Sequence, residues 1–217
     1  MKKFCNICNK EIISDEEFCP YCHFKFIEPV KKVEEKIVDI VFEDNEDMFQ
    51  HEMIDSCCCK VKGFSKKIDY KVNLIFNKHN MLIDDRAFFQ NENICSLTFK
   101  EEVEKIGKSA FEECPNLKKV EFLDGFFCID EYAFKNSSLK ELIMKNAADN
   151  IKSEAFKGTK IVELKLHKYF YAEGISSNAF DDIETFKKFI VDDEDDAEPF
   201  MDCEILKDNL YIIPEDE

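Results

Sequence analysis

The stretch IGKSAFEECPNLKKVEF, residues 106–122, decides the fold, because versions of it recur along the chain. It begins at Ile106, places an Ala-Phe pair four residues later, and ends with three apolar residues at spacings of three and two. The Ala-Phe pairs are Ala87-Phe88, Ala110-Phe111, Ala133-Phe134, Ala155-Phe156 and Ala179-Phe180, at steps of 23, 23, 22 and 24 residues. Copies that keep such a register indicate a repeat protein, and they explain why the chain contains 22 Phe.

Each repeat predicts one strand and one turn. The apolar trios are Ile94/Leu97/Phe99, Leu117/Val120/Phe122, Leu139/Leu142/Met144, Ile161/Leu164/Leu166 and Phe186/Phe189/Val191. The last two members of each trio alternate with mostly polar residues, as in a strand with one buried face. The segment from each Ile to its Ala-Phe pair predicts a short helical turn, for which Asp84, Asp130 and Ser176 are candidate N-caps.

Stacking is what would make these units stable, since one repeat cannot bury its own apolar face. The sequence therefore predicts an α/β repeat solenoid with a parallel sheet along one face. An earlier strand at Val72, Leu74 and Phe76 brings the expected number of strands to six. Residues 203–214 are expected to form a last strand that closes the solenoid.

The repeat resembles the BspA-type leucine-rich-repeat family, and residues 106–122 match that family's pattern almost position for position. The resemblance covers about residues 70–191 and implies binding or adhesion rather than chemistry. The family's Cys after the Ala-Phe pair is present once, as Cys114. The other copies carry Asn91, Ser137, Thr159 and Ile183 there.

Four cysteines near the N-terminus have the spacing of a metal site. Cys5, Cys8, Cys19 and Cys22 form two Cys-x2-Cys pairs separated by ten residues. Four thiolates in this arrangement suit one Zn²⁺, and a closed shell of four protein ligands makes a structural rather than a catalytic ion. Residues 1–27 resemble the short zinc-ribbon family, and we expect them to form a small zinc ribbon.

Charge divides the chain further. Residues 28–56 carry a net charge of -7 and residues 192–217 carry -11, out of -17 for the whole chain. We therefore expect an acidic linker at 28–56 and a solenoid with capping segments at 57–217. Apolar residues at 33–41 fit either a short helix or an edge strand, and both stay open. Cys57, Cys58 and Cys59 are interpreted as part of a strand with small buried side chains.

Several function classes are disfavoured. The first ten residues lack the apolar core of a signal peptide, and free thiols beside a zinc site suit a reducing compartment, so we expect a cytoplasmic protein. The sequence contains no run long and apolar enough to span a bilayer. The four His lie in separate segments, and neither a P-loop nor a dinucleotide fingerprint is present. We expect the chain not to be an enzyme.

The remaining hypothesis is an intracellular protein-interaction module or scaffold, with the partner bound on the exposed face of the repeat sheet. The residues predicted to face outward there are Lys119, Glu121, Leu123, Glu141, Ile143, Lys145, Glu163, Lys165, His167, Lys188 and Ile190. An alternative is a nucleic-acid-associated regulator that contacts DNA or RNA through the zinc ribbon. The ribbon has no excess of basic residues and its flanks are acidic, which argues against this alternative.

Overall fold

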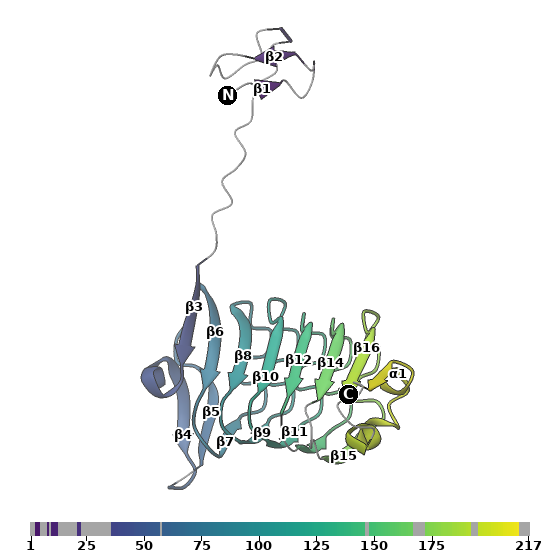
Figure 1. The fold of residues 1–217 in the computed structure, drawn as a ribbon. Helices are drawn as coiled ribbons and strands as arrows, with labels where there is room; N and C mark the ends of the chain where they lie inside the picture. Colours follow the sequence, from purple (N-terminus) through teal and green to yellow (C-terminus); the bar gives the residue numbers. More distant parts are fainter. Residues whose placement is uncertain are drawn as a thin grey trace, which may run out of the picture. The chain divides into compact units, whose positions relative to one another are not determined.

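The computed structural model describes residues 3–4, 8, 10–12, 21–22, 36–56, 58–145, 148–166, 172–191 and 195–212. The chain forms two compact units, Met1–Glu35 and Lys36–Glu217 (Figure 1). In the first unit, strands β1 (Lys3–Phe4) and β2 (Glu11–Ile12) pair antiparallel. The second unit holds all the repeats.

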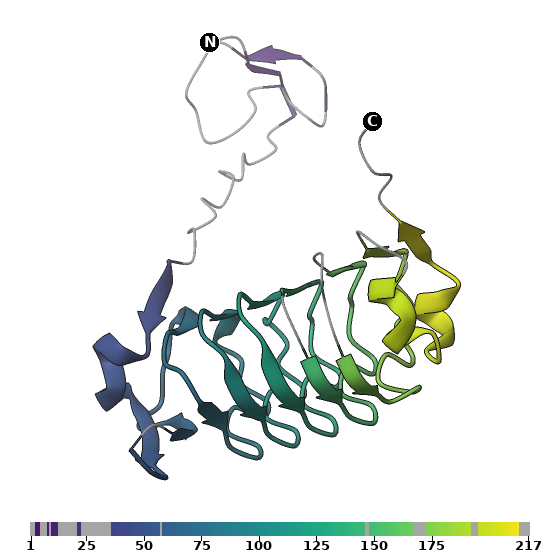
Figure 2. The ribbon, with the colours of Figure 1, turned by 60° about the horizontal axis from the view of Figure 1, so that its bottom comes forward.

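The second unit is a β-solenoid whose coils each add a strand to two different sheets (Figures 1 and 2). The eight-stranded sheet consists of β3 (Ile37–Val41), β6 (Lys71–Phe76), β8 (Ile94–Phe99), β10 (Lys119–Phe122), β12 (Glu141–Met144), β14 (Glu163–Leu166), β16 (Lys188–Val191) and β17 (Leu210–Ile212). All its strands are parallel; six are the predicted repeat strands, and β17 lies within the expected closing strand at 203–214. The predicted parallel sheet is confirmed.

A second sheet was not expected from the sequence. It consists of β4 (Phe49–Met53), β5 (Cys59–Phe64), β7 (Met81–Ile83), β9 (Val103–Ile106), β11 (Phe126–Ile129), β13 (Ala148–Ile151) and β15 (Ala172–Ile175). Each of its last five strands ends at the Ile that opens a repeat, and only β4 and β5 pair antiparallel. The solenoid core is therefore enclosed between two sheets.

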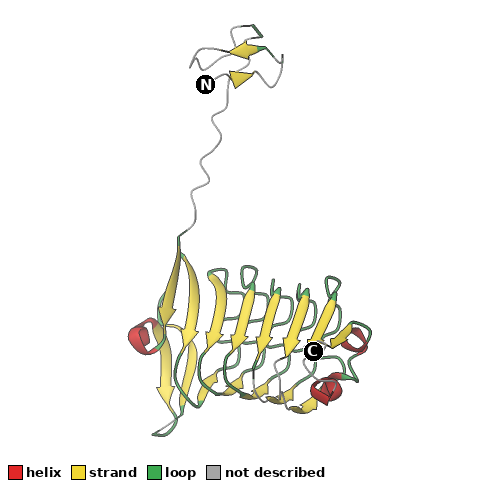
Figure 3. Cartoon of the chain, viewed as in Figure 1, coloured by secondary structure: helices red, strands yellow, loops and turns green. Residues whose placement is uncertain are grey.

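The predicted helical turn at each Ala-Phe pair is wrong, and with it the α part of the predicted α/β class. Ser109 and Glu113 both have φ of 56°, in the left-handed region. These residues reverse the amide direction, so Ser109, Phe111 and Glu113 donate to carbonyls of the following coil at 3.1, 2.7 and 2.8 Å. In a helix the amides beyond the first turn, such as those of Phe111 and Glu113, would donate to carbonyls of their own segment. The few described helices lie only at the two ends of the solenoid (Figure 3).

Two of the columns of buried side chains in the core show how the repeats stack. The turn column is made of Phe88, Phe111, Phe134, Phe156 and Phe180, whose neighbouring ring centroids are 5.2, 5.4, 5.2 and 5.0 Å apart. The strand column is made of Phe76, Phe99, Phe122, Met144, Leu166 and Val191, all buried. One buried Phe per coil accounts for five of the 22 Phe, and its place in the core is as the repeat pattern predicted.

The N-terminal end of the solenoid begins earlier than expected. Residues 36–56, placed by the sequence in an acidic linker, form β3, a 3-10 helix η1 (Glu43–Met48) and β4. The structure differs from the predicted boundary because Ile40, Phe42 and Phe49 are buried in the core despite the surrounding acidic residues. Of the two alternatives for residues 33–41, the edge strand forms over 37–41.

The cysteine run and the expected closing strand lie at opposite ends of the solenoid. Cys59 is buried in β5 and Cys58 is half-buried beside it, as the strand interpretation predicted, and Cys57 lies outside the described residues. At the C-terminal end, η2 (Asp195–Phe200) and α1 (Glu204–Lys207) precede β17, which closes the eight-stranded sheet (Figure 2). The ring centroid of Phe200 lies 6.2 Å from that of Phe180 and 5.5 Å from that of Phe189, so Phe200 covers the C-terminal end of the core.

Candidate functional site

The outer face of the eight-stranded sheet carries side chains in rows, because its strands pair in register. The polar row contains Asp39, Asn73, Ser96, Lys119, Glu141, Glu163 and Lys188. The central row contains Val41, Ile75, Thr98, Glu121, Ile143, Lys165, Ile190 and Tyr211. Neighbouring strands in a sheet lie about 4.8 Å apart, so each row forms a continuous strip across the coils.

In the N-terminal half of this face, polar side chains form hydrogen bonds and ion pairs with one another. Asn73 Nδ2 donates to Asp39 Oδ1 at 2.8 Å, and Ser96 Oγ donates to Asn73 Oδ1 at 2.7 Å. Farther along, Lys119 Nζ lies 3.0 Å from Glu121 Oε1. Polar groups already paired with one another gain little from a new partner.

The C-terminal half differs. Within the described part of the chain, Glu141, Glu163, Lys145 and Lys165 form no ion pair. They surround Ile143, beside which a hollow of about 440 Å³ opens in the surface. The hollow is lined by Lys140, Glu141, Leu142, Ile143, Val162, Glu163 and Lys165. Five of the predicted outward residues therefore cluster around one apolar depression, four of them in its wall.

Two of the predicted surface residues need comment. His167 lies outside the described residues. Ile190 is only 7% exposed, so its predicted role as an accessible contact is wrong. It is paired in register with Tyr211 of β17, whose ring lies 3.9 Å from Lys188 Nζ. The extra strand and its aromatic side chain fill the space next to Ile190.

Sequence reasoning missed Val162 and Tyr211, which are 38% and 46% exposed. Tyr211 could have been found from the alternation in the expected last strand, since it lies between two apolar positions. Val162 precedes its strand directly and carries no periodic signal.

The predicted metal site lies only partly within the described residues. Cys8 and Cys22 are described and half-buried, whereas Cys5 and Cys19 lie outside the described residues. β1 and β2 flank the first Cys-x2-Cys pair. Among the described residues, no three His, Cys, Asp or Glu side chains come together as metal ligands.

The titratable groups with large pKa shifts are structural. Burial alone would raise the pKa of Asp130, but hydrogen bonds from Lys105, the Glu131 amide and Lys152 outweigh it and lower this pKa to about 2. Asp130 lies 2.6 Å from Lys105 Nζ and 3.1 Å from Lys152 Nζ. A carboxylate held ionised by two lysines is a poor proton donor or acceptor at neutral pH.

The buried thiols are equally inert. Burial raises the pKa of Cys114 to about 12, and the Cys114 Sγ–H donates to the Phe88 carbonyl at 3.2 Å. Burial also raises the pKa of Cys203 to about 12. Because the thiolate is the reactive form of cysteine, neither group is a candidate nucleophile at neutral pH.

Comparison with known proteins gives one family match. The family model described as "BspA type Leucine rich repeat region" matches residues 62–193 in six copies. No curated protein and no solved structure matches the chain. Among the described helices, none has the length and hydropathy of a membrane span.

Proposed function

The chain belongs to the BspA-type leucine-rich-repeat family, and on that premise we propose that it is a non-catalytic interaction module whose eight-stranded sheet binds a protein partner on its outer face. Leucine-rich repeats generally mediate protein–protein interaction, and the family is typically non-enzymatic. We place the contact on the C-terminal half of that face, around Ile143.

The hollow beside Ile143 carries the proposal. It combines an apolar floor with a charged rim, the arrangement found at the centre of protein interfaces. Glu141 and Glu163 follow one another in the polar row, while Lys145 lies beyond the central row on the opposite side. A complementary partner would insert an apolar side chain beside Ile143, with basic groups toward the glutamates and acidic groups toward Lys145 and Lys165.

The test is affinity capture from the source cell with the full chain as bait, followed by mass spectrometry. Ile143→Asp places a charge in the apolar hollow and should remove the partners captured by the wild-type chain. Phe127→Asp is the matched control, since Phe127 is a 39% exposed apolar residue on the outer face of the seven-stranded sheet. Both variants should melt at the wild-type temperature. Retention of the same partners by Ile143→Asp would contradict the proposal.

For the N-terminal unit we propose one structural Zn²⁺ bound by Cys5, Cys8, Cys19 and Cys22. The spacing of the two Cys-x2-Cys pairs supports this, as does the length of the unit, since so few residues cannot bury a sizeable core without a metal or another crosslink. Metal analysis of the purified chain should give one zinc per molecule, and Cys5→Ser should release it, whereas Cys95→Ser should not. A folded N-terminal unit that contains no metal would overturn the assignment.

We also propose that the protein works in the cytoplasm. Cys59, Cys114 and Cys203 are buried and form no disulfide, as thiols do in a reducing compartment. Fractionation of the source cell with an antibody to the chain tests this. Recovery of the protein from the medium or the cell surface would contradict it.

A further inference from the structure

The turn side of the solenoid carries its own ladder of hydrogen bonds, and that ladder starts abruptly. Between coils, the amides of Phe88 and Gln90 donate to the carbonyls of Ala110 and Glu112, each at 2.9 Å. The same pairs recur in the later coils. In the first of these turns, the Phe89 carbonyl is equivalent to the Glu112 carbonyl of the next turn. It accepts no hydrogen bond within the described residues.

The ladder begins only at this turn because the preceding coil is short. β5 and β6 are joined by six residues, Ser65–Tyr70, which contain no Ala-Phe turn. The next connection, between β7 and β8, has ten residues, 84–93. Part of the first Ala-Phe turn is therefore left uncovered.

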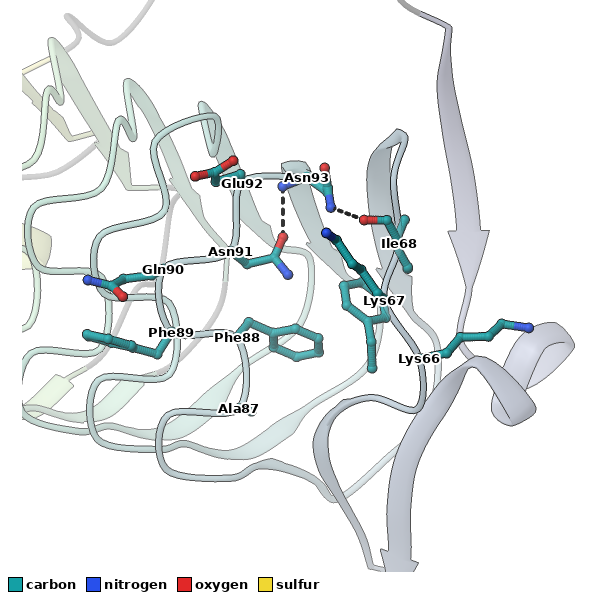
Figure 4. Close-up of a pocket in the computed structure, with 11 residues that line it drawn as sticks. Lys66, Lys67, Ile68, Ala87, Phe88, Phe89, Gln90, Asn91, Glu92 and Asn93 are labelled. Atoms are coloured by element: carbon teal, nitrogen blue, oxygen red, sulfur yellow. Dashed lines mark hydrogen bonds between the residues drawn. The ribbon is translucent and has the colours of Figure 1, made fainter.

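A hollow of about 420 Å³ occupies the uncovered position (Figure 4). Its lining comes from two segments, Phe64 with Lys66–Ile68 and Ala87–Asn93. The half-buried Phe64 provides apolar surface, and the buried Phe88 packs behind it, with ring centroids 5.1 Å apart in an edge-to-face arrangement. The hollow thus has an apolar side at Phe64 and a polar side.

Two hydrogen-bond donors point into this hollow. The backbone amides of Asn93 and Ile94 donate to Asn91 Oδ1 at 2.9 and 3.1 Å, which fixes the orientation of the Asn91 amide group. Its Nδ2 is therefore directed at the hollow, and the Lys67 side chain extends toward it from the other wall (Figure 4). Neither donor has an acceptor within the described part of the chain.

The charge at the hollow is positive. Lys66 and Glu92 also line it, but their charged groups point away from it (Figure 4). In the later coils the position of Asn91 holds Cys114, Ser137, Thr159 and Ile183, all buried. The amide donor is thus confined to the one coil whose turn is uncovered.

We infer that this hollow binds an acidic residue of an extended partner peptide. The carboxylate would accept hydrogen bonds from Lys67 Nζ and Asn91 Nδ2, and a peptide amide would donate to the Phe89 carbonyl. An adjacent apolar side chain would pack against Phe64. This surface is separate from the face around Ile143 and does not depend on it.

The test uses a phage-displayed random peptide library, selected on the full chain and followed by fluorescence anisotropy with the enriched peptides. We expect the peptides to share an acidic residue next to an apolar one. Lys67→Glu should weaken binding about tenfold by reversing the charge. Asn91→Asp keeps the Oδ1 acceptor but replaces the donor, and should weaken binding by a similar factor.

Lys160→Glu is the matched control, because Lys160 is an exposed lysine in a later coil. It should bind the peptides like the wild type. Replacing the acidic residue of the peptide by its amide should weaken binding by about the same factor as Lys67→Glu. The inference fails if the peptides share no acidic residue or bind both hollow variants normally. It also fails if acetate or inorganic phosphate alone binds as tightly as the peptides, or if the hollow proves to be occupied by a second copy of the chain.

Discussion

The turn column and the strand column share one core, yet only the first keeps the same residue in each of its five members. In the turn column, successive Phe rings stack with interplanar angles of 10, 6, 2 and 11°. The strand column stacks Phe76, Phe99 and Phe122, and then changes to Met144, Leu166 and Val191. Left-handed residues lie on both sides of the first four Ala-Phe pairs, and Asp182 follows the fifth, so the turns hold the rings of the turn column in one orientation. The strands impose no such limit, so any apolar side chain of suitable volume fills the strand column.

The largest effect is expected in the turn column. Phe134→Ala removes a fully buried ring that stacks on Phe111 and Phe156, and should lower the free energy of unfolding by about 3–5 kcal/mol. Phe111→Ala and Phe156→Ala should behave alike. Urea denaturation followed by circular dichroism measures the loss. A loss below about 1 kcal/mol at all three positions would show that the column does not hold the coils together.

A smaller loss is expected in the strand column. Met144→Ala leaves a cavity of lower volume, and should cost about 2–3 kcal/mol in the same urea titration. Met144→Leu should be nearly neutral, with a change below about 1.5 kcal/mol, because it conserves volume. Phe134→Leu should cost more than Met144→Leu, since it interrupts a stack. Equal costs for the two leucine variants would remove the distinction between the columns.

Asp130, which directly follows β11 at the start of the Ala133-Phe134 turn, gives a pH-dependent prediction. The pKa of Asp130 is lowered to about 2 in the folded chain, from an ordinary value of about 3.9. Its stabilisation is therefore present above about pH 4 and is lost as the pH falls toward 2. Asp130→Asn should cost about 1–2 kcal/mol at pH 7 and almost nothing near pH 2. A cost that does not change with pH would mean that the charge of Asp130 contributes nothing.

The smallest effect is a gain in stability. Glu113 has φ of 56°, a conformation that glycine adopts without strain, and Gly158 holds the equivalent position in a later coil. Glu113→Gly should raise the free energy of unfolding by about 0.5–1 kcal/mol, after the higher entropy of the unfolded glycine chain is subtracted. Thermal melting compares it with the wild type. A lower melting temperature would show that the strain at Glu113 is worth less than the exposed hydrogen bond that Gln90 Nε2 donates to Glu113 Oε2 at 2.6 Å, which the variant also loses.

The sequence predicted the repeat register, the six repeat strands and the closing strand of the eight-stranded sheet, and one buried Phe per repeat, because these depend on apolar spacing. It did not predict the seven-stranded sheet. There the inward residues are three apart, as in Val103 and Ile106 or Phe126 and Ile129, rather than two apart as in a regular strand. That spacing is also typical of a helical turn. The signal available in the sequence was the apolar residue three positions before the Ile that opens a repeat, as at Val103 and Phe126.

The turn geometry escaped prediction for a related reason. Left-handed positions are usually recognised by glycine, and here Ser109, Tyr132 and Glu154 hold them instead. For the candidate interaction surface, alternation placed Ile143 and Lys165 correctly on the outer face. It could not show that Tyr211 would fill the space beside Ile190, because that contact depends on how the chain returns after the last repeat.

The inter-coil bonding described for the turns and the two sheets has a mechanical consequence. Each coil is attached only to the coils on either side, by hydrogen bonds that lie along the solenoid axis. Force applied between the two ends would therefore load one interface after another, and the weakest would open first. Each released repeat of 23 residues lengthens the chain by about 75 Å. The solenoid would then extend stepwise under tension and shorten again as the coils restack.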